Sequence, residues 1–338
     1  MKRLLLLAAL AACSKASSPP ATSESAASSP AAKPAVGKVV TARFDSAALG
    51  VAKDVVVYLP ASYETSGKRY PVFYYLHGLG GEETNWTDGG KLDETADALG
   101  LDAIVVMPDG DDGFYADSAK PVDYDACMKD GTGLFLPQRI KKSRCIRASK
   151  YETYITKDLV GWVDATYRTL ATREGRAIAG LSMGGFGALQ LAMRHPDLFV
   201  AAASHSGVDA LLYGGPIPYA KGKVITITDV KTWGDGLGPF GAWIRGIFGP
   251  DLATWQGYDP ATLAAKLDKS GPALYVDCGT EDEFLLHNGM QYLHDLLTEK
   301  GIEHAYYIGP GHHNFDFWSV RVKHSLEFLR GKTAKPAT

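Results

Sequence analysis

The sequence feature that most constrains the fold is a serine between two glycines, in Gly180-Leu181-Ser182-Met183-Gly184. The apolar residues before it are typical of a buried strand, and residues 183–194 have the pattern of a helix. A serine on such a sharp strand-to-helix turn projects from the edge of a sheet, and its neighbours must be small because the backbone is crowded there. The helix N-terminus also favours a developing negative charge. Ser182 is therefore the candidate nucleophile.

The serine turn alone is weak evidence, because this pattern also arises by chance in glycine-rich chains, so the surrounding elements matter. Short apolar runs at 55–60, 71–76 and 103–108 indicate strands, and residues 92–99 have a helical pattern. Apolar strands that alternate with helices are typical of a mostly parallel sheet covered by helices on both faces. We therefore expect an α/β fold with Ser182 at the edge of its sheet.

The N-terminus has the layout of an export signal. Residues 1–13 combine a basic start, an apolar run too short to span a membrane permanently, and small residues before Cys13. The sequence Leu-Ala-Ala-Cys at 10–13 resembles the lipobox of bacterial lipoproteins, in which the cysteine is lipidated and becomes the mature N-terminus. An ordinary cleaved signal with an incidental cysteine is the alternative. Because Ser14 follows, and not the Asp of inner-membrane retention, we expect an outer-membrane lipoprotein that faces the periplasm or the surface.

The rest of the chain divides into a tether and one body. Residues 14–38 are mostly Ser, Ala and Pro without apolar periodicity, which is typical of a disordered tether. Residues 39–331 are numerous enough to bury one large core. The net charge is −3 and no basic stripe is present, which excludes the electrostatic pattern of a nucleic-acid-binding protein. We expect membrane contact through the lipid and no nucleic-acid partner, while nothing in the sequence indicates the oligomeric state.

An exported protein reaches an oxidising compartment, where disulfides between its cysteines persist. Cys127 and Cys145 bracket a polar, glycine-containing insertion, so we expect them to pair, whereas Cys278 lies in a strand-like run and should be a buried thiol. No cluster has the spacing of metal ligands, so we predict no metal site. Asp109-Gly110-Asp111-Asp112 offers oxygens for calcium, but it lacks the length and distal Glu of an EF-hand, so a turn is the better interpretation.

A glycine-rich loop, His77-Gly78-Leu79-Gly80-Gly81, directly follows the strand at 71–76. Its small residues let backbone N–H groups approach a ligand at the edge of the sheet, where a second donor to an oxyanion is needed. A plain turn needs fewer glycines. We therefore predict that the N–H groups of Leu79 and Met183 form the pair of oxyanion donors.

An acid and a base are expected in two later loops, because this type of fold orders its residues as nucleophile, acid, histidine. The apolar run at 272–279 leads into a loop that contains Glu281, Asp282 and Glu283. A last strand at 303–308 leads into the adjacent pair His312 and His313. Residue chemistry alone leaves both choices open. His205 also lies near this edge, but it precedes the expected base position, so a structural hydrogen bond is the better interpretation.

The ordered motifs resemble the α/β-hydrolase esterases, which include S-formylglutathione hydrolase (esterase D), tributyrin and feruloyl esterases, and the mycobacterial antigen 85 mycolyltransferases. The matching segments, spread over about 42–330, are Leu76-His77-Gly78-Leu79-Gly80-Gly81 with Asn85-Trp86, Pro108-Asp109-Gly110 with Phe114-Tyr115-Ala116-Asp117, the serine turn as far as Leu189, and Asp277-Cys278-Gly279-Thr280-Glu281-Asp282. The segment at about 117–150 is longer than in the usual family member. The resemblance implies an α/β-hydrolase fold in which the aromatic-rich residues 208–265 form a cap insertion.

The resemblance also selects among the candidate residues. Asp282 matches the family's acid in a Gly-x-x-Asp pattern, with Glu281 kept in reserve. His313 matches the family's spacing of a histidine between Gly311 and a Trp five positions later. By the same likeness, Gly78, Phe114 and Tyr115 are expected to bind substrate, and no cofactor is implied.

The expected activity is that of a serine esterase, which hydrolyses a small acyl ester or a carbohydrate-linked ester through an acyl-enzyme. An acyltransferase of the antigen 85 type uses the same triad, so the residues leave that alternative open. A non-catalytic binding lipoprotein that keeps the fold is a second alternative. A thioesterase acting on S-formylglutathione is disfavoured, because that substrate is cytosolic, whereas the export signal directs this protein out of the cytosol.

Overall fold

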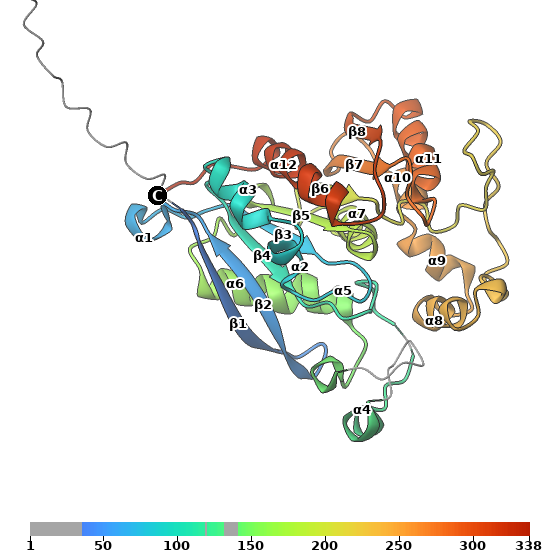
Figure 1. Cartoon of the computed structure of the whole chain (residues 1–338), viewed down its shortest axis with the longest axis horizontal. Coiled ribbons are helices and arrows are strands. Elements are labelled where there is room, and N and C mark those ends of the chain that lie inside the picture. Colours follow the sequence, from blue (N-terminus) through green and yellow to red (C-terminus); the bar gives the residue numbers. More distant parts are fainter. Residues whose placement is uncertain (1–35, 119, 132–140) are drawn as a thin grey trace, which may run out of the picture. The chain divides into compact units, whose positions relative to one another are not determined.

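The computed structural model describes residues 36–118, 120–131 and 141–338, all within one compact unit, Ala35–Thr338 (Figure 1). The predicted signal at 1–13 with its lipidation site Cys13, and nearly all of the predicted tether at 14–38, lie outside the described residues. Within the described part, no helix is both long enough and apolar enough to span a bilayer.

The core of the unit is one sheet of eight strands in the order β1-β2-β4-β3-β5-β6-β7-β8. Strands β3 to β8 run parallel to one another, whereas the pairs β1/β2 and β2/β4 are antiparallel. The strands are β1 (Lys38–Ser46), β2 (Val51–Leu59), β3 (Val72–Leu76), β4 (Ile104–Pro108), β5 (Arg176–Leu181), β6 (Ala201–His205), β7 (Ala273–Gly279) and β8 (His304–Gly309). This topology confirms the predicted α/β class. Strand β1 was not predicted, because its outer position gives it a mixed polar sequence and not an apolar run.

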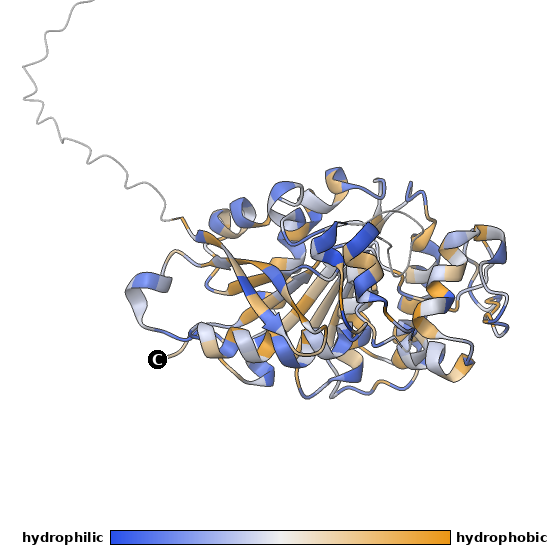
Figure 2. Cartoon of the chain, turned by 90° about the horizontal axis from the view of Figure 1, so that it is seen from below, coloured by the Kyte–Doolittle hydropathy of each residue, from blue (hydrophilic) through white to orange (hydrophobic). Residues whose placement is uncertain are grey.

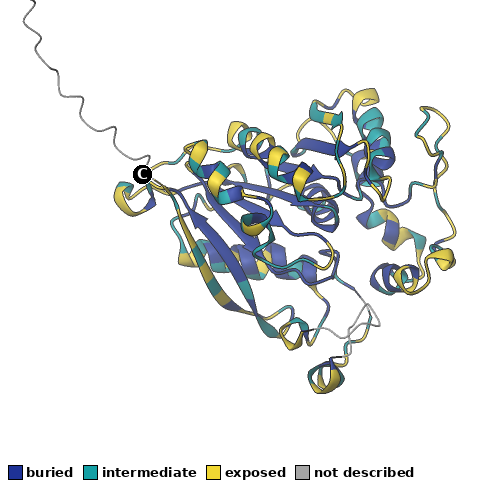
Figure 3. Cartoon of the chain, in the orientation of Figure 1, coloured by how far each residue is buried: buried dark blue, intermediate teal, exposed yellow. Residues whose placement is uncertain are grey.

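Two apolar cores lie on the two faces of the sheet, because successive side chains of a strand point to opposite faces. In β3, Tyr74 and Leu76 join the larger core, while Phe73 and Tyr75 join the smaller one. The smaller core packs under helices α2 (Asn85–Asp88), α3 (Leu92–Ala98) and α12 (Phe315–Lys332). The larger core packs under α5 (Tyr151–Thr153), the π-helical turn η2 (Tyr154–Leu159), α6 (Val160–Thr166), α7 (Met183–Arg194) and α11 (Leu286–Glu299). Figures 2 and 3 show the central strands as a hydrophobic, buried layer whose covering helices expose their outer sides.

The predicted cap segment leaves the sheet after β6 and returns to it at β7. It contains an irregular stretch, the short turn η4 (Asp235–Leu237) and helices α8 (Pro239–Phe248), α9 (Leu252–Tyr258) and α10 (Pro260–Ala264). Trp243 and Phe248 of α8 and Trp255 of α9 are buried and form one cluster with Phe114 and Phe186. Two further short helices, α1 (Tyr63–Ser66) and α4 (Tyr124–Asp130), lie in the loops of the first half of the chain.

Candidate active site

Ser182 occupies the single residue between β5 and α7, in a backbone conformation with φ +54° and ψ −118°. A non-glycine residue at positive φ is strained by about 1–3 kcal/mol, so the surrounding structure must enforce it. The close packing of the two flanking glycines does so. A Cβ on Gly180 would lie 2.2 Å from the carbonyl oxygen of Gly184, and a Cβ on Gly184 would lie 2.4 Å from that of Leu76. The glycines predicted from the motif are therefore required by backbone contacts around Ser182.

Ser182, His313 and Asp282 form one continuous chain of hydrogen bonds. The hydroxyl Oγ of Ser182 lies 2.9 Å from Nε2 of His313, and Nδ1 of the same ring lies 2.6 Å from Oδ2 of Asp282. The three residues come from the loops after β5, β7 and β8, whose carboxyl ends meet at one edge of the sheet. A buried carboxylate at Nδ1 places the ring proton on that nitrogen, which leaves Nε2 free to accept the proton of the serine.

Asp282 is held more tightly than the other acids of its loop. It is 1% exposed, and its Oδ1 accepts hydrogen bonds from the N–H groups of Phe284 (3.0 Å) and Leu286 (3.3 Å). The backbone therefore occupies one carboxylate oxygen and leaves the other for His313. Glu281, which the sequence kept in reserve, instead accepts a hydrogen bond from the N–H of Gly311 at 2.5 Å.

The neighbouring histidine, His312, points away from the serine. Its Nδ1 lies 2.8 Å from Oε1 of Glu283, and both side chains are more than half exposed. The other oxygen of Glu283 accepts the backbone N–H of His313 at 2.9 Å. The structure thus assigns different environments to the two adjacent histidines: His313 is enclosed beside Ser182, and His312 faces solvent.

Two aromatic rings hold the imidazole of His313 edge-on. Phe284 lies 4.8 Å and Trp318 lies 5.0 Å from it between ring centroids. Trp318 is itself fixed, because its indole N–H donates to the hydroxyl of Ser206 at 3.1 Å. Phe284, in contrast, is 70% exposed and so forms an apolar rim beside the catalytic groups. The Trp used to choose His313 from the sequence is therefore also its packing partner.

Of the two residues predicted to donate to the oxyanion, Met183 directly follows Ser182, and Leu79 lies in a turn that approaches it. Met183 is the first residue of α7, where an N–H group has no partner within the helix. Leu79 lies in the tight turn closed by the hydrogen bond from Gly81 N to Gly78 O at 3.0 Å. A Cβ on Gly78 would lie 3.3 Å from Cβ of Ser182, so this glycine allows the turn to approach the nucleophile. Among the residues that the structure describes, no hydrogen bond runs from the N–H of Leu79 or of Met183 to a backbone carbonyl in a turn or loop.

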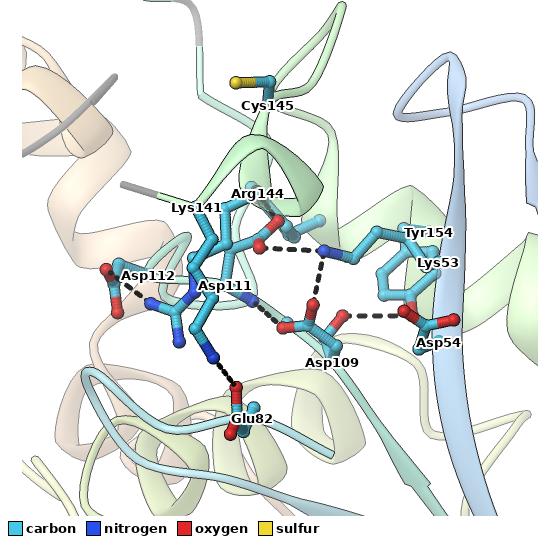
Figure 4. Close-up of polar contacts among 12 residues, drawn as sticks. Lys53, Asp54, Glu82, Asp109, Asp111, Asp112, Lys141, Arg144, Cys145 and Tyr154 are labelled. Atoms are coloured by element: carbon cyan, nitrogen blue, oxygen red, sulfur yellow. Dashed lines mark hydrogen bonds and ion pairs between the residues drawn. The ribbon is translucent and has the colours of Figure 1, made fainter. Parts of the chain in front are cut away.

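A buried lysine, not predicted from the sequence, supports the loop after β4. Nζ of Lys53 lies 2.7 Å from Asp109 and 2.8 Å from Asp111, and its side chain is 1% exposed (Figure 4). Burial alone would raise the pKa of Asp109, but the contact with His77 and the charge of Lys53 hold that pKa well below its usual range. Burial and the charge of Asp109 raise the pKa of Asp111 to about 6. The ammonium group thus balances the carboxylates that suggested calcium.

A period of two along β2 could have located Lys53. Residues two positions apart in a strand share a face, so Lys53 lies on the same face as Val51, Val55 and Val57, which pack in or against the larger core. A charged residue on a buried face needs a partner of opposite charge, and the acidic loop at 109–112 supplies it.

Phe114 and Tyr115 lie in the core and do not line an open surface. They are 4% and 0% exposed. Phe114 packs edge-on against Phe186 and Trp243, and the hydroxyl of Tyr115 donates to the carbonyl of His77 at 3.0 Å. The prediction that they contact substrate therefore finds no support in their placement, because burial gives them no surface to offer. Tyr115 instead braces the loop that carries the Leu79 turn, and Phe114 packs in the aromatic cluster beside α8.

The remaining sequence predictions concern structural residues. Cys127 and Cys145 form a disulfide, with their Cα atoms 5.7 Å apart, and Cys278 is a buried thiol. His205 is fully buried between Asp277 and Ser325, at 2.8 Å from each, which is the structural hydrogen bonding expected for it. Within residues 36–118, 120–131 and 141–338, no group of three or more His, Cys, Asp or Glu side chains could hold a metal ion.

Comparisons with known proteins identify relatives over most of the chain. Residues 46–329 match the "Esterase" family model. Esterase Rv1288 of Mycobacterium tuberculosis is 36% identical over 283 residues, which cover 81% of this chain and 55% of that protein. The chain therefore spans little more than half the length of that relative. Diacylglycerol acyltransferase/mycolyltransferase Ag85A of the same species is 28% identical over 286 residues, or 78% of this chain and 74% of that protein.

Solved structures show the same fold. An S-formylglutathione hydrolase from Agrobacterium tumefaciens superimposes with a TM-score of 0.64 at 20% identity, covering 89% of this chain and 97% of that one. A ferulic acid esterase superimposes with a TM-score of 0.63 at 23% identity, covering 88% of this chain and 99% of that one. At these identities the likeness establishes the architecture, while the chemistry depends on the residues around Ser182.

Proposed function

The chain belongs to the esterase family, as its motifs predicted, and from that premise we propose that it is a serine carboxylic-ester hydrolase that works through an acyl-enzyme. The observation that carries this proposal is the unbroken chain of hydrogen bonds from Ser182 through His313 to the buried Asp282. A positioned base beside a serine on a strained turn at the edge of the sheet is the arrangement that acyl transfer requires.

In the proposed mechanism each group has its own step. Nε2 of His313 takes the proton of Ser182 as Oγ attacks the ester carbonyl, and Asp282 stabilises the imidazolium that forms. The carbonyl oxygen becomes an oxyanion, for which the N–H groups of Leu79 and Met183 are the proposed donors. His313 then returns the proton to the departing alcohol, leaving the acyl group on Ser182. Water, activated by the same histidine, attacks this acyl-enzyme and releases the acid.

The direct test compares wild-type protein with Ser182→Ala on p-nitrophenyl acetate. We expect the variant to lose at least about 10⁴-fold in kcat, because the nucleophile is removed while the fold is kept. Thermal unfolding of both proteins provides the control for folding. A wild-type protein without Ser182-dependent turnover would instead support a non-catalytic binding protein.

The substrate is proposed to be a small acyl ester or a carbohydrate-linked ester. The apolar rim at Phe284, beside an enclosed His313, can accept an acyl or aromatic group. The structural likeness to a ferulic acid esterase makes feruloylated sugars a sensible probe. Rates measured on aryl esters of increasing acyl length, together with acetylated and feruloylated sugars, will identify the preferred class.

A second candidate is acyl transfer to a carbohydrate hydroxyl, which the similarity to Ag85A favours. Both reactions share the acyl-enzyme and differ only in whether water or an alcohol attacks it. Product analysis with and without a sugar acceptor separates them. If a transacylated product dominates when the acceptor is present, the protein is a transferase and not a hydrolase.

We also propose that the protein is an exported lipoprotein anchored through Cys13, in the outer membrane and facing the periplasm or the surface. The signal-like sequence at 1–13 and the Cys127–Cys145 disulfide, which suits an oxidising compartment, support this. Metabolic labelling with an alkyne fatty acid should mark the wild-type protein and not Cys13→Ser. Equal labelling, or soluble wild-type protein after fractionation, would contradict anchoring at this residue.

A further inference from the structure

We propose that Arg144 is a positioning residue for the oxyanion loop, defined as residues 78–81, and that the Cys127–Cys145 disulfide holds Arg144 in place. The inference rests on the proposed function, because it assigns the Leu79 amide of this loop a role in binding the oxyanion. Arg144 belongs to the short turn η1 (Lys142–Arg144), which directly precedes Cys145.

The guanidinium of Arg144 binds the backbone carbonyls of the oxyanion loop. Nη2 donates to the carbonyl of Gly81 at 2.6 Å and to that of Gly80 at 3.3 Å. Nη1 lies 3.4 Å from Oδ2 of Asp112, which follows β4 (Figure 4). The Arg144 side chain is only 13% exposed, so water competes little for its contacts with Gly81 and Asp112, whereas the Gly80 contact is exposed. One planar cation therefore ties together the oxyanion loop and the loop after β4, two segments far apart in sequence.

Asp112 holds the same loop from a second direction. Its Oδ1 accepts the N–H of Gly80 at 2.7 Å, while its Oδ2 faces Arg144. The peptide groups on both sides of Gly80 are thus fixed, one by the carboxylate and one by the guanidinium. Gly80 has φ +74°, so the turn depends on a conformation that glycine readily adopts. Fixing Gly80 also fixes the orientation of the preceding residue, Leu79, whose N–H is the proposed donor.

The disulfide determines where Arg144 can lie. Cys145 follows Arg144 directly and is joined to Cys127 in helix α4; both cysteines are buried. A covalent link one residue away restricts the backbone from which the guanidinium projects, and this lowers the entropy lost when the guanidinium binds the two carbonyls. Preorganised donors are effective in catalysis because they do not have to reorganise during the reaction.

Lys141 provides a matched comparison. Its Nζ lies 2.8 Å from Glu82, immediately after the loop, but the two side chains are 69% and 41% exposed. An exposed ion pair contributes little, and this one contacts no backbone group of the loop. Arg144→Ala and Lys141→Ala each remove one positive charge beside the oxyanion loop. Only the first should therefore affect the oxyanion donor.

The kinetic test uses the full chain and p-nitrophenyl acetate, with phenylboronic acid as a tetrahedral adduct former at the serine. Since losing one oxyanion donor typically costs about 100- to 1,000-fold, a misplaced donor in Arg144→Ala should cost about 10- to 100-fold in kcat. KM should change less than about threefold, and the boronate Ki should rise with the loss in kcat. Arg144→Lys should recover part of the rate, since an ammonium can reach one carbonyl but not both. Lys141→Ala should match the wild type.

Four outcomes separate the possible failures. Arg144→Ala kinetics equal to those of Lys141→Ala would overturn the positioning role and leave the esterase assignment intact. A fall in kcat with an unchanged boronate Ki would overturn it too, because a merely structural role does not select for the tetrahedral state. If Arg144→Ala unfolds, Arg144→Lys decides by the same two readouts. Absence of Ser182-dependent turnover in the wild type would overturn the proposed function and this inference together.

A double-mutant cycle tests the role of the disulfide. Replacing both cysteines by serine should lower kcat in the same direction, and Arg144→Ala should have a smaller effect in that background than in the wild type. Thermal unfolding, measured in parallel, shows whether the variants remain folded at the assay temperature. Fully additive effects in folded variants would overturn the link between the disulfide and Arg144.

Discussion

Replacing Asp282 by Asn tests the proposed mechanism at one pair of atoms. The substitution keeps the size and shape of the side chain and exchanges one carboxylate oxygen for an NH₂ group. Two backbone N–H groups, from Phe284 and Leu286, already donate to Oδ1 at 3.0 and 3.3 Å. The amide oxygen of Asn must stay there, because an NH₂ group would face two donors. The NH₂ group is therefore directed at His313.

The consequence is a change in the tautomer of His313. An NH₂ group at the position of Oδ2, 2.6 Å from Nδ1 of His313, forces Nδ1 to accept and moves the ring proton to Nε2. Nε2 then donates to Ser182 and cannot take its proton. In serine hydrolases this change of tautomer costs about 10⁴-fold in kcat, which is about 5 kcal/mol of the barrier. Because the side chain is buried, solvent cannot repair the arrangement.

The assay is steady-state hydrolysis of p-nitrophenyl acetate from pH 6 to 9, together with thermal unfolding of each protein. Asp282→Asn should lose kcat while it keeps its unfolding temperature within a few degrees. Glu283→Gln is the matched control, since it makes the same chemical change one residue away on an exposed side chain. It should cost no more than about fivefold, the size expected of an exposed contact. A loss below tenfold in Asp282→Asn, or an equal loss in Glu283→Gln, would refute the reasoning.

Three further predictions use other residues. His313→Ala should reduce kcat by about 10³-fold or more and His312→Ala by less than about fivefold, because only the first contacts Ser182; the reverse order in the p-nitrophenyl acetate assay would contradict the proposed base. Burial raises the pKa of Asp209 to about 7, so the folded protein binds a proton that the unfolded chain has lost, and stability should fall as pH rises from about 4 to about 7, by roughly 4 kcal/mol at most. Asp209→Asn should therefore raise the unfolding temperature more at pH 8 than at pH 5, and an equal change at both pH values would show that Asp209 does not titrate as stated. Lys53→Met should destabilise the fold by about 3–5 kcal/mol in urea unfolding, since two carboxylates lose their only buried cation among the described residues, and a loss below 1 kcal/mol would contradict this.

The sequence was sufficient where local rules apply. The serine turn is recognisable because its glycines are demanded by contacts within a few residues, Gly180 with Gly184 among them. The apolar strands are recognisable because burial on both faces leaves no polar positions. The order of strands and loops then places an acid loop and a histidine loop at the edge where Ser182 lies. These inferences need only short stretches of chain and the rule that parallel strands end together.

Only the tertiary structure could decide contacts between segments that are distant in sequence. Residue chemistry alone did not decide which of two adjacent histidines meets Ser182, 131 residues away in the chain; the family's spacing pointed to His313, and the structure shows the contact. The buried ion pairs of Lys53 join it to residues 56 and 58 positions later in the chain, and the sequence near Lys53 does not show which acidic segment will face it. Arg144 is the same kind of case, since its partners lie 32 to 64 residues earlier in the chain. Electrostatic and packing contacts of this kind depend on distance in space, and distance in space is set by the complete fold and not by neighbouring residues in the sequence.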